Sequence, residues 1–294
     1  MTQDTGQINV RGVNHHYEWI RQPEASVEKP VMVFIHGWGG SARYWQKTAQ
    51  ALSKHFDCLL YDMRGFGRSL LPLSNPSALT YELEDYADDL AALLDALGLE
   101  KIYLNGHSMG ASIATLFLNR YPQRVKRAIL TCSGIFEYEE KSFKTFHKAG
   151  TYVVKFRYKW FLRVPFAERL FMARFLHRRL SRQICREFLE DFLIANYDAA
   201  VGTIYTSVSK KAAEMMPGEF AKLQVPTLLV SGEKDIIIPA AMGREAASKS
   251  EKVEYFEIPN TAHFPMLEDE ETYLNRVLQF LEVSETPELV PESS

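Results

Sequence analysis

The stretch Ile102–Asn119, IYLNGHSMGASIATLFLN, places a serine between two glycines where two hydrophobic patterns meet. Its first residues are typical of a short buried strand, and the residues from Ala111 onward are typical of an apolar helix. A sharp turn from strand into helix brings the backbone close to itself, so positions two before and two after the apex have little room for a side chain. Gly106 and Gly110 occupy those positions. The G-x-S-x-G pattern therefore predicts a nucleophile elbow with Ser108 at its apex.

Length and composition are those of an ordinary globular chain of 294 residues, with 46% hydrophobic and 24% charged residues. The net charge of −3 indicates no polyelectrolyte partner for the chain as a whole. The first ten residues lack a basic start followed by an apolar run, so we expect no signal peptide. Nor does any uncharged apolar run approach the length of a transmembrane helix. Cys58, Cys132 and Cys185 are odd in number and widely spaced, which favours a reducing, cytoplasmic location over a disulfide framework or a zinc site.

Strand-like and helix-like segments alternate along most of the chain. An antiparallel pair is predicted near the N-terminus, in residues 8–22. Buried strands are then predicted within residues 30–37, 56–69, 101–105, 125–134, 226–232 and 253–259. Helices are predicted within 41–52, 80–98, 111–118, from about 240 onward and in 269–283. In the second of these helices, Thr80 is the expected N-cap. This alternation predicts an α/β fold, with a mostly parallel sheet covered by helices on both faces.

The alternation is interrupted once, between residues 135 and 220, where the spacing is helical and no strand pattern occurs. A segment of this length is too long for a strand-to-helix loop, so we expect a helical cap or lid inserted into the core. The expected organisation is a first core part at 1–134, the cap at 135–220 and a second core part at 221–283. The polar, proline-bearing residues 284–294 are expected to form a flexible tail.

A serine hydroxyl needs a base to accept its proton and a third group to hold that base. In parallel α/β sheets such groups lie on loops at the carboxyl ends of strands. Asp235 follows the predicted strand 226–232, and His263 follows the strand 253–259. The chain order Ser, Asp, His predicts a catalytic triad of Ser108, Asp235 and His263. Glu233 is the rival acid; two weaker rivals are Glu137 and Asp62.

Acyl transfer also needs hydrogen-bond donors for the oxyanion that develops in the transition state. The backbone N–H of Met109, at the start of the helix after Ser108, is one candidate. The glycine-rich loop HGWGG at 36–40 follows a buried strand, and the N–H of Trp38 is the second candidate. Side chains and backbone expected to line the substrate pocket or to support the catalytic groups are His36, Gly37, Gly39 and His107.

Five motifs together resemble those of the α/β-hydrolase superfamily: HGWGG, DMRGFGRS, GHSMGA, GEKDIIIP and NTAHFPMLE, in this order. The resemblance covers about residues 30–135 and 220–280 and implies an eight-stranded, mostly parallel sheet with a helical cap. It assigns the nucleophile to Ser108, the acid to Asp235 and the base to His263, with Met109 and Trp38 as oxyanion-hole donors. In the second motif, the resemblance gives Asp62 and Arg64 structural roles. One departure is Ala111, where many relatives carry a third glycine; we expect it to affect helix packing and not chemistry.

The serine at the apex distinguishes this chain from haloalkane dehalogenases and epoxide hydrolases, which carry an aspartate there. The resemblance is closest to serine carboxylesterases with a helical cap, including carrier-protein methyl ester esterases. It implies hydrolysis of carboxylic esters with small to medium acyl chains, without a metal or organic cofactor. The alternatives on the same triad are a thioesterase, a C–C bond hydrolase, a perhydrolase, or a hydrolase of acyl esters linked to a lipid or a carrier protein. A binding protein that retained the fold is a further alternative, although such proteins usually lose the serine or the histidine.

The expected cap is strongly basic. Residues 141–216 contain fifteen Lys or Arg and six Asp or Glu, a net charge of +9, and aromatic residues alternate with the basic ones. One interpretation is a set of cap helices with solvated basic outer faces. The other is a landing surface for an acidic partner, such as an anionic membrane surface or an acyl carrier protein. A nucleic acid is not expected, because no nucleic-acid-binding motif accompanies the charge.

Overall fold

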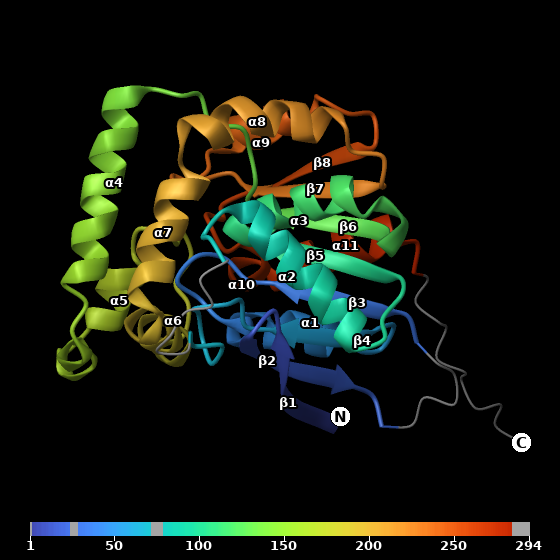
Figure 1. Cartoon of the computed structure of the whole chain (residues 1–294), viewed down its shortest axis with the longest axis horizontal. Coiled ribbons are helices and arrows are strands. Elements are labelled where there is room, and N and C mark those ends of the chain that lie inside the picture. Colours follow the sequence, from blue (N-terminus) through green and yellow to red (C-terminus); the bar gives the residue numbers. More distant parts are fainter. Residues whose placement is uncertain (1, 24–28, 72–78, 284–294) are drawn as a thin grey trace, which may run out of the picture.

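The computed structural model describes residues 2–23, 29–71 and 79–283. The expected tail at 284–294 lies outside the described residues. The described chain forms an eight-stranded sheet in the order β1-β2-β4-β3-β5-β6-β7-β8 (Figure 1). β1 and β2 pair antiparallel, β2 pairs antiparallel with β4, and all other neighbours are parallel. The predicted α/β fold with a mostly parallel eight-stranded sheet is therefore confirmed.

Seven of the strands lie within or close to the predicted segments, whereas β1 begins at Thr2, six residues before the antiparallel pair predicted in residues 8–22. Their bounds are β1 Thr2–Val10, β2 Val13–Arg21, β3 Val31–Ile35, β4 Asp57–Tyr61, β5 Ile102–His107, β6 Val125–Thr131, β7 Thr227–Gly232 and β8 Val253–Ile258. Alternate residues of a strand point to opposite faces. In β3, for example, Val33 and Ile35 belong to one buried core and Met32 and Phe34 to another. Hydrophobic side chains on both sides explain why the central strands are continuous apolar runs in the sequence.

Helices cover both faces of the sheet. The core helices are α1 Gln46–Leu52, α2 Leu83–Ala96, α3 Met109–Arg120, α9 Ala240–Ala247, α10 Pro265–Glu268 and α11 Glu270–Leu281, with short 3₁₀ helices η1 Ala42–Trp45 and η2 Pro122–Arg124. α1 packs with α11 on one side, and α2 packs with α3 on the other. α2 begins at Leu83 with Glu82 as its N-cap, so the predicted cap at Thr80 is wrong. The Thr80 hydroxyl instead bonds Asp85 and accepts the N–H of Glu82.

Between β6 and β7 the chain is helical, as its spacing predicts. We call residues 135–220 the helical segment. It contains α4 Glu140–Lys155, η3 Lys159–Arg163, α5 Ala167–Met172, α6 Arg182–Ile194, α7 Tyr197–Ser207 and all but the last residue of α8 Lys210–Ala221. α4 to α7 gather on one side of the sheet, whereas α8 lies over the core (Figure 1) and contacts α3 and α9. Among the described helices, we find none with the length and apolar character required to cross a bilayer.

α3 approaches the sheet so closely that two positions have no room for a side chain. A Cβ on Gly106 would lie 2.7 Å from the carbonyl oxygen of Gly110, and a Cβ on Gly110 would lie 2.4 Å from that of His36. Both neighbours are backbone atoms, which cannot rotate away. The two glycines are therefore required by close backbone packing, as the spacing around Ser108 predicts.

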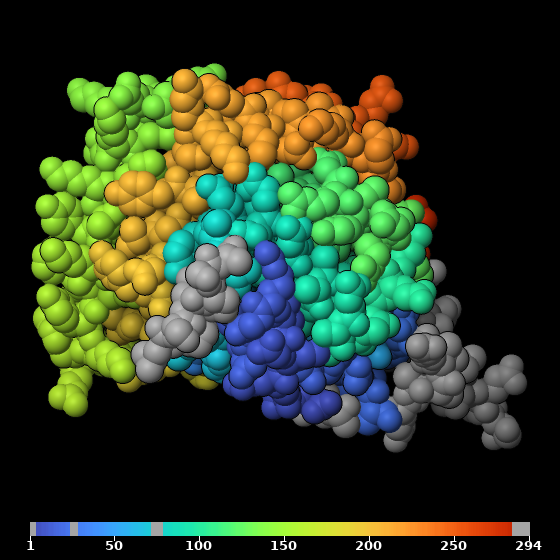
Figure 2. All heavy atoms as spheres, viewed as in Figure 1, coloured from blue at the N-terminus to red at the C-terminus, as the bar shows by residue number. Residues whose placement is uncertain are grey.

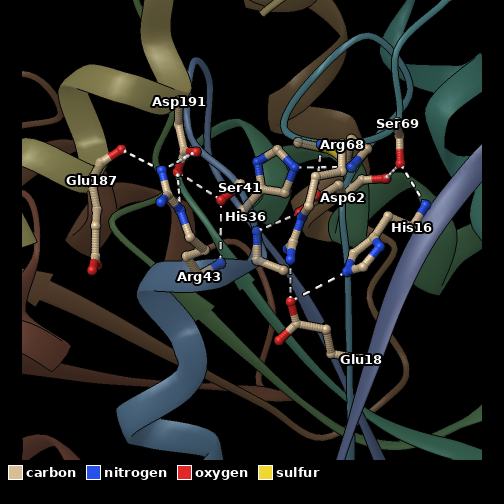
Figure 3. Close-up of polar contacts among 12 residues, drawn as sticks. His16, Glu18, His36, Ser41, Arg43, Asp62, Arg68, Ser69, Glu187 and Asp191 are labelled. Carbon is tan, nitrogen blue, oxygen red and sulfur yellow. Dashed lines mark hydrogen bonds and ion pairs between the residues drawn. The ribbon is translucent and has the colours of Figure 1, made fainter. Parts of the chain in front are cut away.

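A polar network ties the loop after β3 to the loop after β4 (Figure 3). The Asp62 carboxylate accepts the N–H of Ala42 at 2.7 Å and the N–H and Nε–H of Arg68, both at 2.8 Å. Arg68 also pairs with Glu18 on β2. Nearby, the buried Arg64 bonds Asp89 of α2 at 2.8 Å. Asp62 and Arg64 thus make structural contacts. The oxygens of the Asp62 carboxylate are occupied by Ala42 and Arg68, so Asp62 is not available as the rival acid.

Replacing Gly110 by Ala should lower the free energy of unfolding by about 2 kcal/mol or more, because the new methyl group must displace the backbone of β3. The matched control is Gly218→Ala in α8, where an added Cβ meets no atom within 4 Å. That change should leave stability equal or slightly higher, because alanine favours helix. Urea unfolding of both variants measures the difference, and equal stabilities would contradict the packing argument.

The network makes the free energy of unfolding depend on pH through Glu18. Burial opposes ionisation of Glu18, but hydrogen bonds from His16 and Gln46 and the charge of Arg68 lower its pKa from 4.5 to about 2. A carboxylate whose pKa is depressed by folding stabilises the protein above its unfolded pKa, and this contribution is lost as the pH falls toward the folded pKa. Its size at neutral pH is on the order of 2 kcal/mol after allowance for solvent screening.

Glu18→Gln should therefore reduce the unfolding free energy at neutral pH, and the gap to the wild type should narrow as the pH falls from 4.5 toward 2. Urea titrations at neutral pH and in acid test this. Glu251→Gln, at an exposed residue, is the control and should change stability little at any pH. A gap for Glu18→Gln that stays constant with pH would contradict the assigned charge state.

Candidate active site

Ser108 lies between β5 and α3 with φ 54° and ψ −121°. For a residue with a Cβ this is a strained conformation, of the kind that persists only when the surrounding structure imposes it. The Ser108 Oγ lies 3.0 Å from Nε2 of His263. The side chain is partly accessible, so a substrate carbonyl can reach the hydroxyl.

His263 links Ser108 to Asp235. Its Nδ1 lies 2.7 Å from Oδ2 of Asp235, and both side chains are buried. A carboxylate only accepts, so Nδ1–H is the donor, and the Nε2 lone pair then faces the Ser108 hydroxyl. The other oxygen of Asp235 accepts the N–H groups of Ile237 at 2.8 Å and Ile238 at 3.1 Å, which fix the carboxylate.

The rival acid Glu233 points elsewhere. Its exposed carboxylate accepts a hydrogen bond from Lys234 at 2.7 Å and from the N–H of Asn260 at 2.9 Å. The structure therefore brings Ser108, His263 and Asp235 together and leaves Glu233 outside this group.

Two backbone donors flank the serine. Within the described parts of the chain, the N–H groups of Met109 and Trp38 have no hydrogen-bond acceptor. Gly37 precedes Trp38, and a Cβ there would lie 3.2 Å from Cβ of Ser108. The 36–40 loop thus passes directly beside the serine. Gly39, two residues after Gly37, has a positive φ of 71°, which lets the loop turn there. Unpaired N–H groups at this position can stabilise an oxyanion.

His36 and His107 are buried in the interior of the protein. His36 Nε2 accepts the N–H of Met63 at 2.9 Å, so Nδ1 carries the proton and donates to the Gly37 carbonyl at 2.8 Å. Burial lowers the pKa of His36, and burial together with the nearby His263 holds the pKa of His107 well below its usual value. Both imidazoles are therefore neutral and serve as structural hydrogen-bonding groups.

A chain of hydrogen bonds connects the loop beside Ser108 to the loop that carries His263. The Gly37 N–H donates to the hydroxyl of Tyr44, and that hydroxyl donates to Nδ1 of His107 at 2.9 Å. Nε2–H of His107 then donates to the carbonyl of His263 at 2.7 Å. Tyr44 was missed by the sequence analysis, and its position in a helical pattern carries no local signal for this role.

The helical segment also holds the loop that carries His263, which we call the histidine loop. The carbonyl of Phe175 accepts the N–H of His263 at 3.0 Å. One oxygen of the buried Glu268 accepts the N–H groups of Ala262 at 2.9 Å and Phe264 at 3.3 Å, on either side of His263. Its other oxygen accepts the N–H groups of two residues of the helical segment, at 2.7 Å each; these are His177 and Arg178.

Phe175 and Glu268 were also missed. Glu268 closes the motif NTAHFPMLE, which was recognised only for His263. The motif thus carried a signal for this residue, whereas Phe175 lies in a helical pattern that gave none.

The 36–40 loop, on the other side of Ser108, also contacts the helical segment. Nε1–H of Trp38 donates to the carbonyl of Ala200 in α7 at 2.9 Å, and the Trp38 ring lies 5.6 Å from that of Phe192. Asp191 of α6 accepts hydrogen bonds of 2.6 Å from Ser41 and from Arg43 (Figure 3). Burial raises the pKa of Asp191 to about 6, although Arg43 and Ser41 oppose the shift.

One group of side chains among the described residues has the spacing of metal ligands: His107, Cys132 and His263, all buried. Each imidazole nitrogen of the two histidines already has a protein hydrogen-bond partner. Burial also raises the pKa of the Cys132 thiol well above its usual value, which disfavours the thiolate that a metal needs. We therefore assign these residues to the serine–histidine site and not to a metal.

Comparisons with known proteins agree with this architecture. The abhydrolase domain-containing protein abhd-5.2 of Caenorhabditis elegans is 26% identical over 92% of this chain, which spans 63% of that protein. The superfamily protein YisY of Bacillus subtilis is 26% identical, over 85% of this chain and 90% of its own length. The crystal structure of the carboxylesterase CesB from B. subtilis superposes with a TM-score of 0.75 at 21% identity, covering 96% of this chain and 92% of the other. At this identity the structural match establishes the fold alone.

A family model described as the alpha/beta hydrolase fold matches residues 30–270, which include every residue of the serine–histidine–aspartate group. This range is most of the chain. The protein therefore belongs to the α/β-hydrolase family.

Proposed function

We propose that the protein is a serine hydrolase that cleaves carboxylic esters of small to medium acyl chains through an acyl-enzyme. The observation that carries the proposal is the continuous hydrogen-bonded chain from Asp235 through His263 to Ser108, with separations of 2.7 Å and 3.0 Å. In this order the carboxylate orients the imidazole, and the imidazole accepts the hydroxyl proton. The family relationship supports hydrolysis, and the ester as substrate is our proposal.

In the first half of the reaction, Ser108 Oγ attacks the ester carbonyl carbon as His263 Nε2 takes the hydroxyl proton. The carbonyl π electrons move to the oxygen, and the N–H groups of Trp38 and Met109 bind the resulting oxyanion. When the oxyanion collapses, the bond to the alcohol breaks and His263 gives its proton to the leaving oxygen. The products of this half are the free alcohol and an acyl-Ser108 ester.

In the second half, water replaces the alcohol. His263 takes a proton from the water as its oxygen attacks the acyl carbon, and the same N–H groups bind the second oxyanion. Collapse of this intermediate breaks the bond to Ser108, and His263 returns the proton to Oγ. The carboxylic acid leaves, and the residues are in their starting protonation states.

We further propose that the helical segment acts as a cap between the core parts 1–134 and 221–283. Three of its aromatic side chains lie near the site. Phe192 packs beside Trp38 and stacks on Phe171 at 5.0 Å, and the ring of Phe175 lies 6.1 Å from that of His263. Apolar walls of this kind suit an acyl chain better than a charged acid.

The preferred acyl length and the type of bond cleaved are tested by measuring turnover of a set of substrates. p-Nitrophenyl esters of increasing chain length give the preferred acyl size, and an acyl thioester, a C–C substrate and an ester with hydrogen peroxide test the alternative reactions. We expect the highest kcat/KM for an ester. Faster turnover of the thioester or the C–C substrate would move the assignment to that reaction class while leaving the triad in place.

Ser108→Ala should lower kcat for an activated ester by about 10⁴–10⁶, because the nucleophile is lost and the remaining groups provide only binding. Steady-state kinetics and mass-spectrometric mapping of a fluorophosphonate adduct measure this. The adduct should lie on Ser108 in the wild type and be absent from the variant. A variant that keeps a tenth of the activity would contradict the proposal.

The neighbouring carboxylates provide the control for the acid. Asp235→Asn removes the negative charge. If the amide oxygen keeps the N–H groups of Ile237 and Ile238, the amide NH2 faces Nδ1, which favours the wrong tautomer of His263. The change should cost orders of magnitude in kcat, whereas Glu233→Gln should be nearly silent. The reverse order would show that the wrong acid has been assigned.

Glu268→Gln should impair turnover through the position of His263. An amide offers one acceptor where the carboxylate has two, so one pair of N–H groups loses its partner. Displacement of the histidine loop by a fraction of an ångström should lower kcat by about 10–10²-fold with a much smaller change in KM. Glu268→Asp should recover part of the loss. Glu271→Gln, at an exposed site on α11, is the matched control and should behave as wild type.

A further inference from the structure

The outer surface of the helical segment combines positive charge with exposed apolar side chains. From Lys141 to Ala167 the chain has seven Lys or Arg and no Asp or Glu. Of the fifteen large hydrophobic side chains that are exposed in the described residues, thirteen lie in the helical segment and eight lie between Tyr152 and Leu170. Exposed apolar groups are normally scattered over a protein surface, so this concentration indicates an interaction surface.

The orientation of α4 explains part of the exposure. One face, with Phe143 and Val154 buried, packs on α7, and a Cβ on Gly150 would meet Ile204 of α7 at 2.9 Å. The opposite face is open at the outer edge of the molecule, where α4 forms the flank of the space-filling view (Figures 1 and 2). A solvent-facing helix surface is usually polar, but here it carries Tyr152, Val153 and Phe156, each about half exposed.

The apolar groups form a continuous row. Ring centroids are 6.0 Å apart between Tyr152 and Phe156, 6.4 Å between Phe156 and Tyr158, and 6.4 Å between Tyr158 and Trp160. Trp160 is 55% exposed. The row therefore continues from the end of α4 into η3 without an intervening polar side chain among these contacts.

Beyond the row, the chain presents two further apolar side chains at the start of α5. Phe166 has a left-handed backbone with φ 64° and is 65% exposed, and Leu170 is 80% exposed. A bulky residue rarely adopts this conformation. We define the docking face as the exposed apolar residues Tyr152, Val153, Phe156, Tyr158, Trp160, Val164, Phe166 and Leu170 with the basic residues Lys155, Lys159, Arg163 and Arg169.

The four basic residues of the docking face have no ion-pair partner within the described ranges. Other arginines of the helical segment are already committed: Arg178 pairs with Asp269 at 3.0 Å, and Arg182 pairs with Glu168 at 2.8 Å. The charge of the docking face is therefore free to act on an external partner, whereas Arg178 and Arg182 are paired with acidic residues of the protein itself.

We propose that the docking face binds the surface of an anionic lipid bilayer. Tryptophan and tyrosine favour the boundary between head groups and acyl chains, and basic side chains there attract acidic lipids. A bilayer can bind both kinds of side chain in the docking face. Its acyl region accommodates the aromatic and aliphatic side chains, and its phosphates bind the basic ones. A second copy of the chain fits poorly, because eight unpaired cations would meet. This proposal does not depend on the reaction at Ser108.

The primary test is co-sedimentation with vesicles of phosphatidylcholine, with and without about 30 mol% phosphatidylglycerol, at about 0.15 M salt. The wild type should pellet with the anionic vesicles, and binding should weaken steeply as salt is raised. Each basic residue near an anionic surface contributes about fivefold in affinity. Reversing Lys155, Lys159, Arg163 and Arg169 to Glu should therefore lower vesicle affinity by at least about 10²-fold.

The matched control reverses four exposed lysines of the α/β core, Lys54, Lys101, Lys126 and Lys252, to Glu. It changes the net charge of the protein equally but leaves the docking face intact. If the two sets lose affinity equally, the binding follows from net charge and the proposal is wrong. Thermal melting of both sets shows whether they remain folded, and every altered side chain is exposed, so we expect melting temperatures close to wild type.

Tryptophan fluorescence measures separately whether the apolar side chains insert into the bilayer. Trp19 and Trp45 are buried, and Trp38 is partly buried, so Trp160 is the exposed tryptophan. Tryptophan emission should shift to shorter wavelength on anionic vesicles, and Trp160→Phe should abolish the shift while vesicle pelleting is retained. Combined replacement of Trp160, Phe166 and Leu170 by Ser should lower affinity for the same vesicles at least tenfold.

The proposal is overturned if the wild type does not pellet with anionic vesicles, or if Trp160 fluorescence is unchanged when it does. Specific binding of an acidic acyl carrier protein, abolished by the docking-face reversals and without vesicle binding, would assign the surface to a protein partner instead. Turnover of a small soluble ester should be unchanged in all docking-face variants. That comparison separates a failure of docking from a failure of the proposed catalysis.

Discussion

The close packing of the turn at Ser108 against the sheet is the constraint on which the rest of the site depends. Gly106 and Gly110 remove the two methyl groups that would collide with backbone carbonyls, and only then can α3 begin directly after β5. The turn forces Ser108 to φ 54°, a conformation that costs on the order of 1–3 kcal/mol and is maintained by the surrounding core. In return, the hydroxyl projects toward His263, and the first N–H of α3 has no acceptor among the described residues.

The neutral state of His107 explains how the two loops beside Ser108 keep a fixed separation. Its Nδ1 must accept from Tyr44 while its Nε2–H donates to the His263 carbonyl, which only the neutral imidazole can do. Burial supplies this state, because desolvation disfavours the charged ring. A protonated His107 would oppose the Tyr44 hydroxyl hydrogen with a second donor. The position of Gly37, and with it that of Trp38, is therefore coupled to the position of the histidine loop.

The sequence predicted the elements whose signals are local. The central strands are apolar runs followed by glycine or polar residues. Ser108, Asp235 and His263 were predicted as a triad because each lies just beyond such a run, and the structure brings their side chains within hydrogen-bond distance. The contacts of Tyr44 and Phe175 were not predictable in this way, since they join residues 63 and 88 positions apart in the chain and depend on packing between elements. Thr80 failed as a cap for a related reason: Asp85 competes for its hydroxyl, and the helix begins three residues later.

The helical segment has two surfaces with different chemistry. Its inner side supplies neutral groups, the Phe175 carbonyl and the rings of Phe171 and Phe192, to the loops around Ser108. Its outer side carries the basic residues of the docking face. Residues 141–216 as a whole have a formal net charge of +9, so the remainder of the chain carries −12. Such a separation orients the molecule in an external field, because an anionic surface attracts one end and repels the other. A bilayer met through the docking face would thus hold the core away from the lipid, with the helical segment between the surface and the sheet.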